Sequence, residues 1–287
     1  MSIQFRDLRY VRIAIDDLEA ATGYATEIAG LQLYARDAGR SYLRSDARAY
    51  SLCYSCAGET DAIALTVASD DDLDLLASRL EAASVESRRF AADECSVRKI
   101  KAGLVCLAPN GLTVEFVWRP MTSGERYHGL RDAGITEFQT VSLRCTDIAA
   151  NERFWIDLLG GVVSDWVGDA CYVRIDDLHH RIALYPSDRD GLLGVGFGVE
   201  SINNVMQNYY WLQARQLPVV HGPGRQPASG LIFVTTRGPR DVLLTFGTGM
   251  ASGVEIDRRP PRQFPDVALS HCAWGSATIV PEFLGEQ

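Results

Sequence analysis

The sequence contains no apolar run that approaches the roughly 20 residues needed by a membrane-spanning helix. Its first ten residues alternate charged and apolar side chains and lack the apolar stretch of a secretory signal peptide. A basic cluster is also missing, and the net charge is −9, so nucleic acid is not an expected partner. We therefore expect a cytoplasmic protein that works without a membrane or nucleic acid.

Cysteine and histidine are also scarce, with seven and five residues. The seven cysteines are scattered, which in the absence of a signal peptide favours reduced thiols. Cys53 and Cys56 form a single CxxC motif, but residues three apart in an extended segment point to opposite faces. This motif is therefore a poor metal or disulfide site. The five histidines are His128, His179, His180, His221 and His271.

The remaining composition is that of a globular protein, with 47% hydrophobic and 23% charged residues over 287 positions. This length suits one large or two ordinary domains. Hydrophobic periodicity predicts two consecutive units, each with a strand, a helix and three more strands. The first has strands over 8–15, 31–34, 41–43 and 49–54 with a helix over 18–29, and the second has strands over 62–67, 85–90, 104–107 and 112–118 with a helix over 70–83.

The same pattern then returns. Tyr10 and Thr140 are 130 residues apart, as are Glu115 and Thr245, so we expect two tandem halves. The third unit has strands over 140–145, 162–166, 170–175 and 181–185 with a helix over 148–159. The fourth has strands over 192–200, 218–221, 231–235 and 242–246 with a helix over 201–215. The predicted class is α+β, with four βαβββ modules.

The domain boundaries follow from this repeat. We expect an N-terminal domain over 1–130, a C-terminal domain over 131–252 and a tail over 253–287. The connection over 121–134 is polar and contains glycine, which is typical of a linker. The tail is rich in proline, and we expect it to wrap over the surface.

The opening strand of the fourth unit has an unusual face. Because side chains alternate along a strand, one face carries Leu193, Val195 and Phe197, while the other carries Gly194 and Gly196. Glycine weakens a strand and often marks the close approach of a ligand or another backbone. We therefore expect the C-terminal domain to contain a cavity beside this strand.

Several local phrases resemble the vicinal oxygen chelate superfamily, in particular its two-domain type I extradiol dioxygenases, which cleave catechols next to the hydroxyl groups. The resemblance covers about residues 3 to 250 and implies a cupped mixed sheet in each half. The phrases lie at 8–18, at 147 with the following FW-DLLGG helix, at 179–184, in the Gly-Pro-Gly-Arg segment 222–225, and at 238–247.

The resemblance also implies a site for Fe(II) or Mn(II) held by two histidines and one carboxylate, with positions left open for substrate and dioxygen. Counting from the neighbouring phrases, these three ligand positions fall on Thr140, Gly194 and Thr245. Glycine offers no donor side chain, and threonine is a poor ligand for these metals. In the N-terminal half the equivalent positions are Tyr10, Ala62 and Glu115, and Glu115 is the one plausible ligand there. We predict that the protein uses no metal and no other cofactor.

One proton-transfer group of the family is retained. The resemblance places its acid–base histidine at His180, with His179 as the alternative, and adjacent strand residues face opposite ways, so one of the two should face the cavity. His221, beside the Gly-Pro-Gly-Arg segment, is a third catalytic candidate, although its position there favours a surface loop histidine over a functional one. The candidate substrate-binding residues are Thr140, Ser142, Tyr172, Gly194, Gly196, Arg225, Gln226, Thr235 and Thr245.

These residues predict a metal-independent enzyme that acts on an aromatic, phenolic or polyketide-like small molecule by proton transfer, as an isomerase, lyase or hydrolase. One alternative is a non-catalytic protein that binds or sequesters an aromatic ligand. Another is an extradiol catechol dioxygenase with a displaced Fe(II) or Mn(II) site. The resemblance further implies a homo-oligomer.

Overall fold

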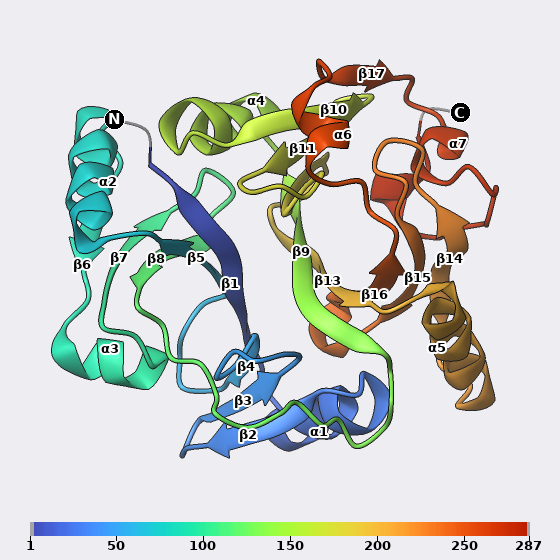
Figure 1. The fold of residues 1–287 in the computed structure, drawn as a ribbon, viewed down its shortest axis with the longest axis horizontal. Helices are drawn as coiled ribbons and strands as arrows, with labels where there is room; N and C mark the ends of the chain where they lie inside the picture. The colour runs from blue at the N-terminus through green and yellow to red at the C-terminus, as the bar shows by residue number, and fades with distance from the viewer. Residues whose placement is uncertain (1–2, 286–287) are drawn as a thin grey trace.

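A computed structural model describes residues 3–285 of the chain. Two mixed β-sheets lie next to one another, one from each half of the sequence (Figure 1). In the first half, two units follow each other in chain order. They comprise β1 (Phe5–Ala14), α1 (Leu18–Gly23) with a π-helical continuation (Tyr24–Ile28), β2 (Gln32–Arg36), β3 (Arg40–Arg44) and β4 (Leu52–Ser55), then β5 (Ala62–Val67), α2 (Asp70–Ala82), β6 (Ser87–Arg89), α3 (Ala92–Arg98), β7 (Ala102–Leu107) and β8 (Thr113–Trp118).

The second half repeats this order. Its third unit contains β9 (Ile135–Cys145), α4 (Ile148–Glu152) with a π-helical continuation (Arg153–Leu158), β10 (Val162–Val167), β11 (Ala170–Arg174) and β12 (Ile182–Pro186). Its fourth unit contains β13 (Gly191–Val199), α5 (Ile202–Ala214), β14 (Val219–Arg225), β15 (Ile232–Arg237), a short 3-10 turn (Pro239–Asp241) and β16 (Leu243–Thr248).

Strand order confirms the predicted repeat. The first sheet runs β2-β3-β4-β1-β5-β8-β7-β6, and the second runs β14-β15-β16-β13-β9-β12-β11-β10-β17, where β17 (Arg262–Phe264) comes from the C-terminal tail. Replacing each strand of the first sheet by its counterpart eight strands later gives the second order, read from the other end, apart from the added β17. The opening strands of the paired units lie antiparallel at the centre, β1 beside β5 and β9 beside β13. The α+β class with four βαβββ modules is therefore confirmed.

The local sequence explains why these helices begin where they do. Asp17 and Asp147 occupy equivalent positions before α1 and α4, and each carboxylate accepts a hydrogen bond from a backbone N–H in the first turn. Ser69 caps α2 in the same way, and the side chain of Asp72 accepts a hydrogen bond from the Ser69 backbone N–H. These caps align each helix across its sheet.

The structure differs from the sequence prediction in three places. Helix α3 was not expected, because its single pair of turns is too short to display a hydrophobic period. β1 and β9 begin earlier than predicted, at Phe5 and Ile135. The segment 222–225, expected to be a loop, continues β14 through a cis Gly222–Pro223 bond, and Gly224 pairs with Phe233 on β15.

The tail continues the second sheet. It forms α6 (Val254–Asp257), β17 (Arg262–Phe264), α7 (Ala268–His271) and a final 3-10 turn (Pro281–Phe283). β17 pairs in parallel with β10 as a ninth strand, and His271, Cys272 and Val280 are buried (Figure 1). The tail is thus a covering layer of the second half. Within residues 3–285, no helix is long and apolar enough to cross a membrane.

Candidate functional site

The second sheet encloses a small polar cavity on its cupped face. Its volume is about 40 Å³, which is room for a single water molecule. β9, β13, β15 and β16 supply one wall, and the segments around β12 and β14 supply the rest. The cavity brings together most of the residues proposed from the sequence, namely Thr140, Ser142, His180, Gly194, Gly196, His221, Gln226, Thr235 and Thr245.

Three of the proposed residues do not line the cavity. Arg225 is exposed at the end of β14. Tyr172 is buried behind His180, with their ring centroids 4.8 Å apart, and its hydroxyl hydrogen-bonds the Tyr185 hydroxyl at 3.0 Å. His179 points away from the cavity toward β10. Tyr172 and His179 therefore support the cavity from behind.

Asp165 is the anchor behind these histidines. This carboxylate on β10 is fully buried and accepts hydrogen bonds from the guanidinium groups of Arg259 and Arg262, with both oxygens engaged by each. It also accepts a hydrogen bond from Nε2 of His179 at 2.7 Å. Burial alone would raise the pKa of Asp165, but the hydrogen bonds from His179, Arg262 and Arg259 outweigh it and hold the pKa far below its usual range. Asp165 is therefore ionised.

This anchor determines the tautomer of both histidines. Burial lowers the pKa values of His179 and His180, the second further depressed by the neighbouring His179, so both rings are neutral. With its Nε2–H donated to Asp165, His179 presents a bare Nδ1, and Nδ1 of His180 lies 3.0 Å away as the donor. The free Nε2 of His180 is then a proton acceptor on the side that lines the cavity.

His221 lies on β14 and not on a surface loop. It is 4% exposed, and its ring packs edge-on against Phe233 at 4.9 Å. Burial, together with the nearby His271, lowers the pKa of His221 to about 4. His221 is thus a second neutral imidazole at the cavity.

The tail closes the cavity, which the sequence did not predict. The Phe283 ring stacks on His221 at 5.3 Å and meets Tyr185 edge-on at 5.1 Å. The neighbouring Glu282 accepts hydrogen bonds from Nε of Arg144 at 2.7 Å and from the Ser187 hydroxyl at 2.9 Å. An aromatic ring of the protein itself therefore covers the cavity, and it is secured by a nearly buried ion pair.

The glycine face of β13 is explained by its neighbours. A Cβ on Gly196 would lie 2.2 Å from Oγ1 of Thr140, and a Cβ on Gly194 would lie 2.9 Å from Cβ of Leu243. Adjacent side chains and backbone, not an open ligand space, therefore require these glycines. A histidine at position 194 would clash with β16.

The residues at the three metal-ligand positions do not fit a metal ion. Thr245 instead shares a hydrogen bond of 2.9 Å with Thr235, and Gly194 has no room for a donor side chain. Across residues 3–285, no group of three or more histidine, cysteine, aspartate or glutamate side chains is arranged to hold a metal. The seven cysteines are free, and Cys53 is buried while Cys56 is exposed.

Part of the chain matches a known family in sequence. Residues 137–246 match the Glyoxalase/Bleomycin resistance protein/Dioxygenase superfamily. The C-terminal half belongs to this superfamily. A biphenyl-2,3-diol 1,2-dioxygenase of Pseudomonas sp. (strain KKS102) is 29% identical over 200 residues, which is 62% of this chain. The match spans 66% of that relative, just under two thirds of its length.

Solved structures of the superfamily share the fold of the whole chain. A halotolerant catechol dioxygenase superposes with a TM-score of 0.88 at 18% identity, covering 98% of this chain and 97% of that one. The Mn(II)-bound glyoxalase from Novosphingobium aromaticivorans superposes with a TM-score of 0.85 at 22% identity, covering 99% and 95%. The chain therefore has the two-domain fold of extradiol dioxygenases.

Proposed function

We propose that this chain is an enzyme that acts on an aromatic or phenolic small molecule by proton transfer, without a metal, with Nε2 of His180 as the base. The observation that carries this proposal is the hydrogen-bonded chain from Asp165 through His179 to His180. It leaves one basic nitrogen, Nε2 of His180, on the side that lines the cavity.

The neutral state of His180 suits a base. A proton on a phenolic hydroxyl or an acidic C–H group would move to Nε2, and the same proton would return to the product at another atom. While His180 holds this proton its ring is positively charged. The negative charge of Asp165 stabilises that ring through the hydrogen bonds from His180 to His179 and from His179 to Asp165. His179 and Asp165 are therefore positioning residues, and His180 is the catalytic candidate. The likeness to a biphenyl-2,3-diol dioxygenase supports an aromatic substrate.

Removing the base should abolish most of the activity. Chelator-treated protein would first be screened against phenols, catechols and polyketide-like compounds, with products detected by mass spectrometry. His180→Gln is expected to lower turnover about 100-fold or more, which is the usual worth of a general base. The exposed His128 gives the matched control, and His128→Gln should retain the wild-type rate. A wild-type rate in His180→Gln would reject the proposal.

Phe283 gives a second prediction, because an aromatic substrate needs the space that its ring covers. Phe283→Ala is expected to tighten binding of a small phenol by about tenfold, since the tail then has less apolar contact to give up. Isothermal titration calorimetry would measure the affinity. Leu284→Ala, at the neighbouring and more exposed tail position, should leave the affinity unchanged. Equal affinity in Phe283→Ala and wild-type protein would show that the ligand does not enter here.

The alternative of a non-catalytic aromatic-binding protein is favoured by the same tail, because an aromatic ligand that displaced Phe283 would take its place against the buried rings of His221 and Tyr185. A bound phenol that is recovered unchanged from every reaction in the screen would support it. A stoichiometric iron or manganese content together with ring cleavage of a catechol would instead support the dioxygenase alternative. Assembly into a homo-oligomer stays a prediction, which light scattering would test.

A further inference from the structure

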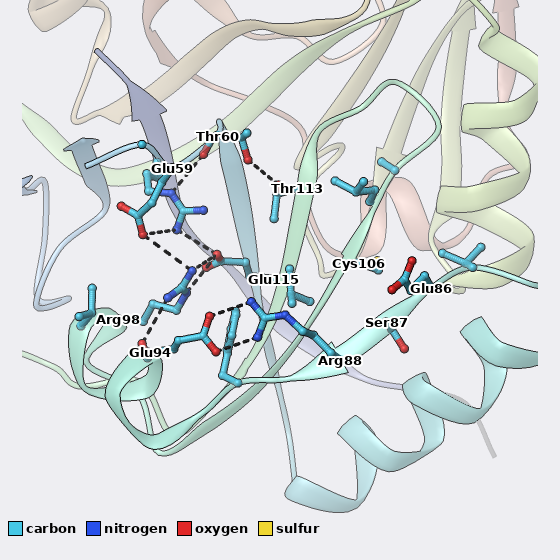
Figure 2. A pocket seen from close by; sticks show the side chains of 18 of the residues that line it. Glu59, Thr60, Glu86, Ser87, Arg88, Glu94, Arg98, Cys106, Thr113 and Glu115 are labelled. Carbon is cyan, nitrogen blue, oxygen red and sulfur yellow. Dashed lines mark hydrogen bonds and ion pairs between the residues drawn. The ribbon is translucent and has the colours of Figure 1, made fainter. Parts of the chain in front are cut away.

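A large cavity lies in the N-terminal half and has no part in the site above. Its volume is about 980 Å³, within the range of small-molecule sites. β7, β8 and α3 line it together with the loops over 58–60 and 84–86, and β1 and β3 contribute Arg12 and Arg40. Figure 2 shows Glu59, Arg98 and Glu115 grouped at one side, with Cys106, Glu86 and Ser87 at the other. The cavity is therefore elongated and has two chemically different ends.

The inner end is built around a buried carboxylate. Glu115 is fully buried, and its Oε1 accepts hydrogen bonds from Nη1 of Arg12 at 2.9 Å and from Nε and Nη2 of Arg98 at 3.0 and 2.9 Å. Its other oxygen accepts a hydrogen bond from the Tyr10 hydroxyl. Two guanidinium groups thus share one carboxylate.

A third guanidinium adds to this positive charge. Nε of Arg40 donates to Oε2 of Glu59 at 2.7 Å, and a more distant Nη1 contact at 3.4 Å reaches Asp37 on the surface. Glu59 Oε1 lies 3.8 Å from Arg12 and 4.0 Å from Arg98. Three guanidinium groups and two carboxylates therefore line the inner end of the cavity.

Two of these guanidinium groups keep unused donors. Among residues 3–285, nothing accepts a hydrogen bond from Nη2 of Arg12 or Nη2 of Arg40, and both side chains line the cavity. Arg12 is only 5% exposed, so its free N–H groups face the cavity and not bulk solvent. Each arginine thus keeps one nitrogen, Nη2, that can donate a charge-assisted hydrogen bond to an oxygen of a bound anion.

Beyond the inner end, the cavity has apolar side chains as well as Glu86, Asp93 and the exposed ion pair of Arg88 with Glu94. Val85, Val105 and Phe154 line it, together with Cys106 and Ala108, both of which are buried. Phe90 lies between the two parts, and the Arg98 guanidinium covers its ring at 4.2 Å from the centroid. This surface suits a hydrocarbon or aromatic body and offers no second charged cluster at depth.

We propose that this cavity is a second ligand site, which binds an organic anion with its carboxylate at Arg12 and Arg40 and its apolar body against Val85 and Val105. The site is independent of the chemistry proposed at His180. It uses the face of the first sheet that corresponds to the cupped face of the second, since Glu115 on β8 is the counterpart of Thr245 on β16.

A charge series tests this site directly. Hydrocinnamate, hydrocinnamyl alcohol and phenylpropylamine share a phenyl body and differ in the charge of the other end. Calorimetric titration is expected to rank hydrocinnamate tightest, by about tenfold over the alcohol, with the amine weakest. Arg40→Gln should remove this preference and leave binding of the alcohol unchanged. Arg36→Gln, whose side chain pairs with Glu19 outside the cavity, is the matched control and should bind as wild type.

Val105→Trp keeps the proposal testable if loss of Arg40 unfolds the protein. It fills the cavity beside Glu115, its partner on β8, and it should weaken all three probes together by about tenfold or more. Circular dichroism would check that each variant is folded. Equal binding of the three probes, tightest binding of the amine, no saturable binding, or hydrocinnamate binding that survives both Arg40→Gln and Val105→Trp would each overturn the assignment.

Discussion

Replacing Asp165 by alanine is expected to lower the free energy of unfolding by about 1–3 kcal/mol, because it leaves the buried His179 N–H and the partly exposed guanidinium groups of Arg259 and Arg262 without their acceptor. Asp165 is fully buried and satisfies two guanidinium groups and one imidazole. Arg262 also comes from β17, so the loss should release the tail strand from β10. Urea unfolding followed by tryptophan fluorescence would measure the change.

Two further variants define the cause of that loss. Asp165→Asn keeps the size and one acceptor oxygen but not the charge. Its free energy of unfolding should therefore lie between those of the wild type and Asp165→Ala. Asp188→Ala removes an exposed aspartate of the same half and should change the stability by no more than about 0.5 kcal/mol. If Asp165→Ala lowered the free energy of unfolding as little as Asp188→Ala, the hydrogen bonds to the Asp165 carboxylate would not stabilise the fold.

The architecture was predictable because each unit carries its own local signals. Capping aspartates precede both α1 and α4, and strand periodicity recurs at a constant spacing, as in Tyr10 and Thr140. Alternation along a strand also placed most of the cavity residues correctly, because side chains two apart share a face. His179 and His180 lie before β12 and not in a strand, and the hydrogen bond from His179 to Asp165 directs that ring away from the cavity and leaves His180 to line it.

The parts that the sequence did not predict depend on contacts between distant segments. Phe283 reaches His221 from a tail without periodicity, and Arg259 and Arg262 reach Asp165 across more than 90 residues of chain. The glycines of β13 gave a correct signal of close approach, but the sequence could not tell a ligand from a neighbouring strand. The charged cavity of the N-terminal half joins Arg12, Arg98 and Glu115 from three separate elements. No local sequence pattern predicts that residues from three separate elements will line one cavity.

Mild acid is expected to destabilise the protein through its buried neutral histidines. The pKa of His221 falls to about 4 in the folded protein from 6.5 in the unfolded chain. Between these values the unfolded chain binds the proton more readily, so the free energy of unfolding falls as the pH drops through 6.5 toward 4. His221 alone should account for about 3 kcal/mol at the lower end of this range. His180, His179 and His271 have lowered pKa values for the same reason, burial, and act in the same direction.

His221→Phe separates this effect from general acid sensitivity. Phenylalanine can pack between Phe233 and Phe283 without a titrating group, so the variant should lose less stability than wild type between neutral pH and pH 5. Asp165 does not interfere there, because its lowered pKa makes its contribution disappear only below its unfolded pKa of about 3.9. Urea unfolding at a series of pH values would give both curves. Parallel curves for wild type and His221→Phe would mean that the pKa of His221 is the same in the folded and unfolded states, which would contradict this prediction.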